Sequence, residues 1–87
     1  MGLFTPSSPL SVTILNNDKT MFQGDIKSLT SENKDGKFDI LNSHSNFITI
    51  ILNSLTVRSK NGQSEQFDFD RGVMQCYNNK IKIFLGV

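Results

Sequence analysis

The sequence has 87 residues, enough for one small domain with a single core and too few for two. Nine basic and eight acidic residues give a net charge of +1, and the lysines are scattered singly, so the sequence predicts no nucleic acid as a main partner. Cys76 is the only cysteine, which excludes an internal disulfide framework. No apolar run approaches the ~20 residues that a membrane-spanning helix needs.

Residues 1–9 contain both prolines and predict a flexible lead-in, and residues 10–87 are then expected to form one domain. Along that domain apolar and polar residues alternate with the period of two that is typical of half-buried strands. The alternation predicts roughly eight to ten short strands and no sustained helix. The segments are 10–15, 20–23, 26–31, a short strand that contains Phe38 and Ile40, and then 47–52, 55–58, 65–70, 73–77 and 81–85.

Turn-forming residues separate these segments. Asn61-Gly62 is the strongest hairpin signal, because both residues accept the positive φ of a two-residue type I′ turn. Asn53-Ser54 is expected to end the apolar run 47–52, and Arg71-Gly72 to turn the chain. Many short strands with such turns predict an all-β fold, a small two-layer antiparallel β-sandwich. The predicted inward-facing residues are Val12, Ile14, Phe22, Phe38, Ile40, Ile50, Val57, Phe67, Phe69, Ile81 and Ile83.

His44 is the only histidine and the first candidate for chemistry, since it lies in a polar loop between two apolar segments. A nucleophile would have to be brought beside it, and nothing in the sequence marks Cys76 as activated. Asp68 and Asp70 share one face of a strand, which indicates a solvated surface rather than a metal site. The sequence therefore predicts no catalytic, cofactor or metal site, and binding is the expected role.

Two stretches of the sequence, 21–24 and 36–47, resemble the amino-terminal domain of the epsilon subunit of rotary F-type ATP synthases. That family usually shows an aromatic-x-glycine, then glycine-x-leucine-glycine-isoleucine-leucine-proline-x-histidine-alanine-proline-leucine. Asp39 stands where a glycine is usual, and Asn42 and Asn46 stand where prolines are usual. The matching residues are Phe22, Gly24, Gly36, Phe38, Ile40, Leu41, His44 and Phe47.

The resemblance implies a non-catalytic subunit of the central stalk, folded as a β-sandwich and without a cofactor. Its partners would be the gamma subunit and the polar loops of the rotor ring (c subunits), and it would meet the membrane only through the complex, at the cytoplasmic face of a bacterial cell membrane. By position in the motif, the interface candidates are Gly36, Lys37, Phe38, Asn42 and His44. Lys37 stands where an acidic residue is frequent, which implies a changed partner loop.

Family members usually continue into two carboxy-terminal helices. This sequence stops after its last predicted strand, so we expect either a naturally one-domain epsilon subunit or an isolated domain of a longer one. In both cases we expect no regulation by those helices in this chain. The alternative reading is a stand-alone β-barrel adaptor or an oligonucleotide-binding module. In that case Phe47, Phe67, Phe69 and Tyr77 would form a platform on which bases stack.

Overall fold

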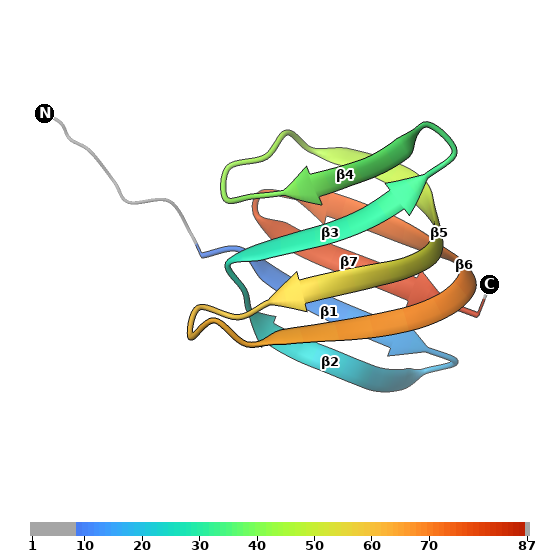
Figure 1. Ribbon diagram of the computed structural model, residues 1–87, viewed down its shortest axis with the longest axis horizontal. Helices are drawn as coiled ribbons and strands as arrows, with labels where there is room; N and C mark the ends of the chain where they lie inside the picture. Colours follow the sequence, from blue (N-terminus) through green and yellow to red (C-terminus); the bar gives the residue numbers. More distant parts are fainter. Residues whose placement is uncertain (1–8, 87) are drawn as a thin grey trace, which may run out of the picture.

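The computed structural model describes residues 9–86, so the lead-in predicted for residues 1–9 lies almost wholly outside the described part. The described part is all-β, as predicted, with seven strands (Figure 1). They are β1 (Ser11–Asn16), β2 (Lys19–Asp25), β3 (Ser28–Asn33), β4 (Gly36–Ile40), β5 (Phe47–Arg58), β6 (Ser64–Tyr77) and β7 (Lys80–Leu85).

The strands form one continuous hydrogen-bonded sheet in the order β2-β1-β7-β6-β5-β3-β4. Neighbours are antiparallel except β1 and β7, which run parallel. Figure 1 shows this sheet folded over into two layers. β3, β4, the second half of β5 and the first half of β6 lie in one layer, and β1 and β7 lie in the other. The long strands β5 and β6 curve from one layer into the other, which gives the predicted sandwich.

The bends in β5 and β6 occur at the residues that were expected to end strands. Asn53 has a φ of 72°, and the β5–β6 register shifts between Leu52 and Ser54. In the first half of β6 the odd-numbered residues Phe67 and Phe69 face the core. From Gly72 onward the even-numbered residues are buried, so the inward side of the strand changes at the bend. The prediction of eight to ten strands was therefore wrong, because a β-bulge bends a strand and keeps it in the sheet.

Gly72 makes the bend of β6 sterically possible. A Cβ atom at this buried position would lie 2.8 Å from Leu85 Cδ2 and 2.9 Å from the Phe84 carbonyl oxygen. The role of this glycine is therefore the close approach of β6 and β7 rather than the predicted turn.

The hairpin at Asn61-Gly62 is present, but its predicted turn type was wrong. The connection between β5 and β6 spans residues 59–63, and of the predicted pair only Gly62 has a positive φ, of 90°. True two-residue loops with positive φ at both positions occur at Asn17-Asp18 and at Asn78-Asn79. Asparagine and aspartate tolerate this left-handed conformation better than other non-glycine residues.

The core lies between the two layers. Its fully buried members are Leu10, Val12, Ile14, Ile26, Leu29, Ile40, Ile51, Leu55, Val57, Met74, Cys76, Ile81, Ile83 and Leu85. Six predicted core residues are among them: Val12, Ile14, Ile40, Val57, Ile81 and Ile83. The four predicted phenylalanines Phe22, Phe38, Phe67 and Phe69 are partly buried and pack against this core.

Ile50 was wrongly placed in the core: it is 52% exposed, whereas the neighbouring Ile51 is fully buried. Apolar residues lie on both sides of the run 47–52, so the period-two pattern could not decide which alternate residues face inward.

Two aromatic pairs connect strands that are not hydrogen-bonded to each other. The rings of Phe22 in β2 and Phe67 in β6 meet edge to face with centroids 6.3 Å apart. Those of Phe38 in β4 and Phe47 in β5 do the same at 6.1 Å. Such pairs contribute about 0.5–1.5 kcal/mol beyond their buried area. They close the two sides of the sandwich where one layer ends beside the other.

Candidate protein-interaction surfaces

One outward surface of the sandwich carries a row of apolar side chains. Cross-strand register places Ile50 beside Val73, Val73 beside Phe84, and Phe84 beside Leu15, so the row crosses four strands. We call the apolar outer face the set Leu15, Ile48, Ile50, Val73 and Phe84. Ile48 is 67% exposed and Phe84 is 37% exposed. A continuous apolar row of this kind on a sheet surface is typical of a binding site for another protein.

Lysine side chains border the apolar outer face. Lys80 and Lys82 point outward from β7, because the alternate residues Ile81 and Ile83 are buried. Register sets Lys82 beside Gln75, and Gln75 beside Ile48. A partner that covers the apolar row would therefore meet two positive charges at its border, which favours acidic groups on that partner.

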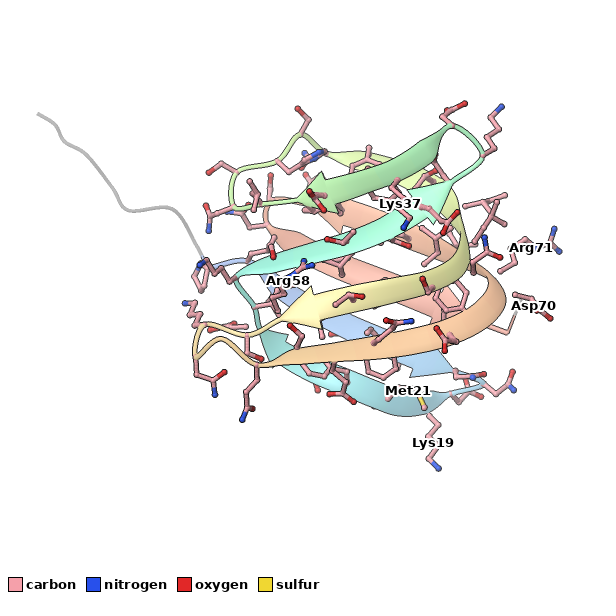
Figure 2. All side chains as sticks on the ribbon, in the orientation of Figure 1. Lys19, Met21, Lys37, Arg58, Asp70 and Arg71 are labelled. Atoms are coloured by element: carbon pink, nitrogen blue, oxygen red, sulfur yellow. The ribbon has the colours of Figure 1, made fainter. Side chains whose placement is uncertain are left out.

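The opposite outward surface is polar at every position. We call it the polar outer face: Thr30, Glu32, Lys37, Asp39, Thr56, Arg58, Gln66 and Asp68, all on β3, β4, β5 or β6. In Figure 2 Lys37 and Arg58 mark it on the layer nearer the viewer. The Thr30 hydroxyl donates to the Asp39 carboxylate, and Arg58 Nη1 donates to Thr30 Oγ1 over 2.8 Å. Asp39, which departs from the family pattern, thus takes part in a cross-strand network.

The five predicted interface residues fall into two groups along β4 and the loop after it. Gly36 and Lys37 lie at the start of β4, whereas Asn42 and His44 lie in the loop after its end. At ~3.3 Å per residue, the strand separates the two groups by roughly 13 Å or more. Phe38 turns inward toward Phe47, and Gly36, with a φ of 123°, forms the β3–β4 turn. Lys37, Asn42 and His44 remain as exposed side chains.

The loop between β4 and β5, residues 41–46, is tied to the β6–β7 turn by asparagine side chains. The Ser43 amide donates to Asn79 Oδ1 over 2.7 Å, and the Asn78 amide donates to Asn46 Oδ1 over 2.8 Å. Asn42 Oδ1 accepts from the side chains of Ser43 and Asn79. The two asparagines that stand where prolines are usual thus fix this loop by hydrogen bonds instead of by ring geometry. Sequence reasoning missed Asn78 and Asn79, which only the fold brings beside this loop.

His44 serves the shape of this loop. Its Nδ1 lies 2.9 Å from the Ser45 carbonyl oxygen, which can only accept, so Nδ1 carries the proton. Its ring rests on Phe47, with centroids 5.1 Å apart. Cys76, the other residue with reactive potential, is buried, and burial raises the pKa of its thiol. These environments offer no activated nucleophile at either residue.

Other kinds of site find little support in residues 9–86. That range contains no cluster of three or more His, Cys, Asp or Glu residues able to hold a metal ion. It also has no helix long and apolar enough to cross a bilayer. Of the stacking platform in the alternative reading, Phe47, Phe67 and Phe69 are partly buried and pack against the core, and Tyr77 is 59% exposed.

Comparisons with known proteins agree with this architecture. A family model described as "ATP synthase, Delta/Epsilon chain, beta-sandwich domain" matches residues 9–86. The ATP synthase epsilon chains of two Clostridium botulinum strains, Eklund 17B / Type B and Alaska E43 / Type E3, are each 29% identical over 72 residues. These 72 residues are 82% of this chain and 54% of the relatives, so the chain spans about half their length.

Solved structures show the same fold. A chain of the Euglena gracilis mitochondrial ATP synthase, in a structure of OSCP, F1 and the c-ring, superposes with a TM-score of 0.85 at 16% identity, over 97% of this chain and 54% of that chain. A chain from a structure of the central stalk and c-ring of Tetrahymena thermophila mitochondrial ATP synthase superposes with a TM-score of 0.77 at 18% identity, over 93% of this chain and 66% of that chain. Because the family model covers all described residues, the chain belongs to the delta/epsilon family of ATP synthase chains, of which it carries the β-sandwich domain.

Proposed function

We propose that this chain is a non-catalytic component of the central stalk of a rotary ATP synthase. In this proposal it binds the gamma subunit through the apolar outer face and the c-ring through β4 and the loop 41–46. The membrane is then reached only through the complex. The observation that carries the proposal is the apolar row from Ile50 to Leu15, which lies on a domain of this family; Ile50 and Phe84 are exposed, and Val73 and Leu15 are partly exposed.

The gamma subunit is assigned to the apolar outer face because a rotor subunit must transmit torque without slipping. A broad contact with an apolar centre and a charged border provides both affinity and a fixed orientation. The polar outer face has no comparable apolar centre, and its charges already satisfy one another in part through Thr30. Lys80 and Lys82 would then meet acidic groups of gamma.

The c-ring is assigned to the exposed residues Lys37, Asn42 and His44. Asn42 and His44 lie on a loop that its hydrogen bonds hold in one shape, so little conformational entropy is lost on binding. Lys37 stays solvated until a partner supplies a carboxylate. Since exposed ion pairs contribute only ~0–1 kcal/mol, Lys37 is expected to affect association rate and specificity more than affinity.

The test compares two charge insertions on the same strand. Ile50→Asp places a carboxylate on the apolar outer face, and Thr56→Asp places one on the polar outer face. Binding of each variant to purified gamma subunit is measured by calorimetry, with thermal melts to show that both variants fold. We expect Ile50→Asp to weaken binding by about thirtyfold, as for a central interface residue worth about 2 kcal/mol, and Thr56→Asp to change it by less than about threefold.

If wild type and Ile50→Asp bind gamma equally well, the gamma subunit does not bind the apolar outer face. Failure of the wild type to bind either gamma or isolated c-ring would overturn the proposed function as a whole. For the c-ring, Lys37→Glu and His44→Ala are each expected to reduce capture of the chain, with Lys60→Glu, in the β5–β6 loop, as a charge-matched control for Lys37→Glu.

A further inference from the structure

The first half of β5 has a free edge. Residues 47–52 pair with β6 on one side, and β3 pairs with β5 only at residues 55–58. Alternate residues of a strand direct their N–H and C=O groups to opposite sides. Along 47–52, half of these backbone groups therefore point to a side where no strand of residues 9–86 pairs with them.

This edge lacks the devices that usually protect exposed strands. The run Phe47-Ile48-Thr49-Ile50-Ile51-Leu52 contains no charge, no proline and no glycine. Three of its six residues are β-branched isoleucines, which favour strand pairing. Natural sheets normally block such an edge with charges, prolines or a covering segment. An uncovered edge of this composition is a template on which another strand can add.

A cavity of about 400 Å³ opens beside the free edge. It lies between β5 and the turn that joins β3 to β4, and Arg71 of β6 lies at its border. Asn33 Nδ2 donates to Thr49 Oγ1 over 3.3 Å and joins the two sides at its base. The lining residues are Asn33, Lys34, Asp35, Thr49, Ile50, Leu52 and Arg71.

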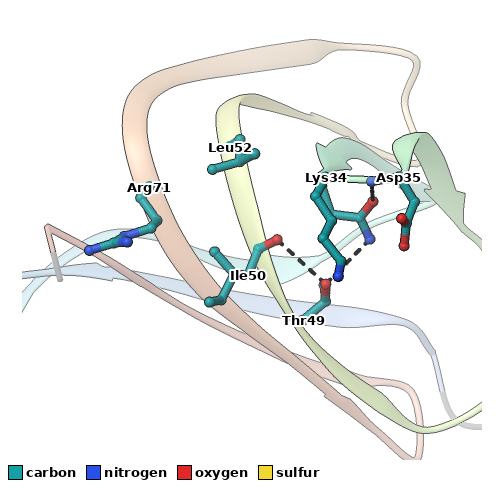
Figure 3. A pocket seen from close by; sticks show the side chains of 7 residues that line it. Lys34, Asp35, Thr49, Ile50, Leu52 and Arg71 are labelled. Carbon is teal, nitrogen blue, oxygen red and sulfur yellow. Dashed lines mark hydrogen bonds between the residues drawn. The ribbon is translucent and has the colours of Figure 1, made fainter.

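Ile50 and Leu52 form one side of the cavity, with Arg71 beyond them, and Lys34 and Asp35 of the turn form the other side. In Figure 3 Lys34 reaches from the turn toward Thr49, while Asp35 projects away from β5. Arg71 lies on the far side of Ile50 and Leu52, away from the turn. A strand added to the edge of β5 would present alternate side chains to these two surroundings. Side chains on the side of Ile50 and Leu52 would be apolar, and those turned toward Lys34 would be acidic.

We propose that the free edge of β5 binds an extended segment of a partner protein in which acidic and apolar residues alternate. Backbone hydrogen bonds to alternate residues of 47–52 hold the segment. Its acidic side chains face Lys34, and its apolar side chains continue the surface formed by Ile50 and Leu52. This edge adjoins the apolar outer face at Ile50. The present proposal rests on the free backbone groups of 47–52 and on Lys34, whereas the gamma proposal rests on outward side chains, so the peptide test and the gamma test can fail separately.

The test uses nuclear magnetic resonance with model peptides. Blocked peptides of about six residues, a length that matches an average strand, alternate valine with glutamate or valine with lysine. Each is titrated to millimolar concentration into the isotope-labelled 87-residue chain. We expect the valine–glutamate peptide to shift the amide signals of residues 48–52 and 33–35, and to bind about fivefold more tightly than the valine–lysine peptide.

Lys34→Glu should remove or reverse this preference, because the charge that selects glutamate is reversed. Lys60→Glu, an equal change in the loop at the far end of β5, should leave it unchanged. The proposal is overturned if neither peptide shifts these signals, if the shifts lie elsewhere on the molecule, or if Lys34→Glu keeps the wild-type preference.

Discussion

The two outward surfaces of this sandwich cover the same core and have opposite chemistry. The apolar outer face is a row of apolar side chains bordered by Lys80, Lys82 and Gln75, whereas on the polar outer face every outward residue is polar. Folding needs only the inward side of each layer, so the polar outer face shows what a surface exposed to water requires. The apolar outer face therefore carries side chains that folding does not explain, and a partner is the physical explanation that remains.

The largest effect is expected where an inward and an outward residue are compared directly. Ile51→Ala should lower the free energy of unfolding by about 2–5 kcal/mol, because Ile51 is fully buried and its removal leaves a cavity. Ile50→Ala, at the next residue on the outer side, should change it by less than about 1 kcal/mol. Urea denaturation of both variants measures the difference. Equal losses would mean that the apolar outer face belongs to the folding core.

The connection between the two layers gives a second comparison. Gly72→Ala should destabilise the chain by about 1–3 kcal/mol, because the new methyl group would collide with β7 backbone and with Leu85. Gly24→Ala is the matched control, since no atom lies within 4 Å of a Cβ atom at that position. Thermal melts that show the same stability for both variants would contradict the close approach of β6 and β7 at the bend.

The smallest effect is expected on the polar outer face. Thr30→Val removes the hydroxyl that joins Asp39 and Arg58, but water can solvate both freed groups at this exposed site. The loss in unfolding free energy should stay below about 1 kcal/mol. Thr56→Val on the adjoining strand serves as the reference in the same denaturation series. A loss of several kcal/mol at Thr30 would show that this network is a main source of stability.

The alternation of apolar and polar residues predicted strand positions well where only one side of a strand is apolar, as in residues 10–14. It failed for residues 47–52, because both sides are apolar and each choice of inward side fits the pattern equally. The ends of β5 and β6 could not be predicted either. Asn53 and Arg71-Gly72 are compatible both with turns and with a bulge inside a long strand, and only the pairing of the whole sheet decides between them.

The candidate site was predictable only in part. The motif 36–47 indicated the family, which the family model confirms, but local sequence could not show that β4 separates Lys37 from His44. The hydrogen bonds that join Asn78 and Asn79 to the loop 41–46 connect residues that are 32 and 36 positions apart in the sequence. Contacts over such distances in sequence leave no local pattern.

Methyl spectroscopy of the chain with and without purified gamma subunit tests the central claim most directly. Ile48 and Ile50 carry methyl groups on the apolar outer face, and Thr30 and Thr56 carry them on the polar outer face. We predict that gamma shifts or broadens the signals of Ile48 and Ile50 and leaves those of Thr30 and Thr56 unchanged. Changes confined to Thr30 and Thr56, or no change at any of the four, would contradict the assignment of the apolar outer face to the gamma subunit.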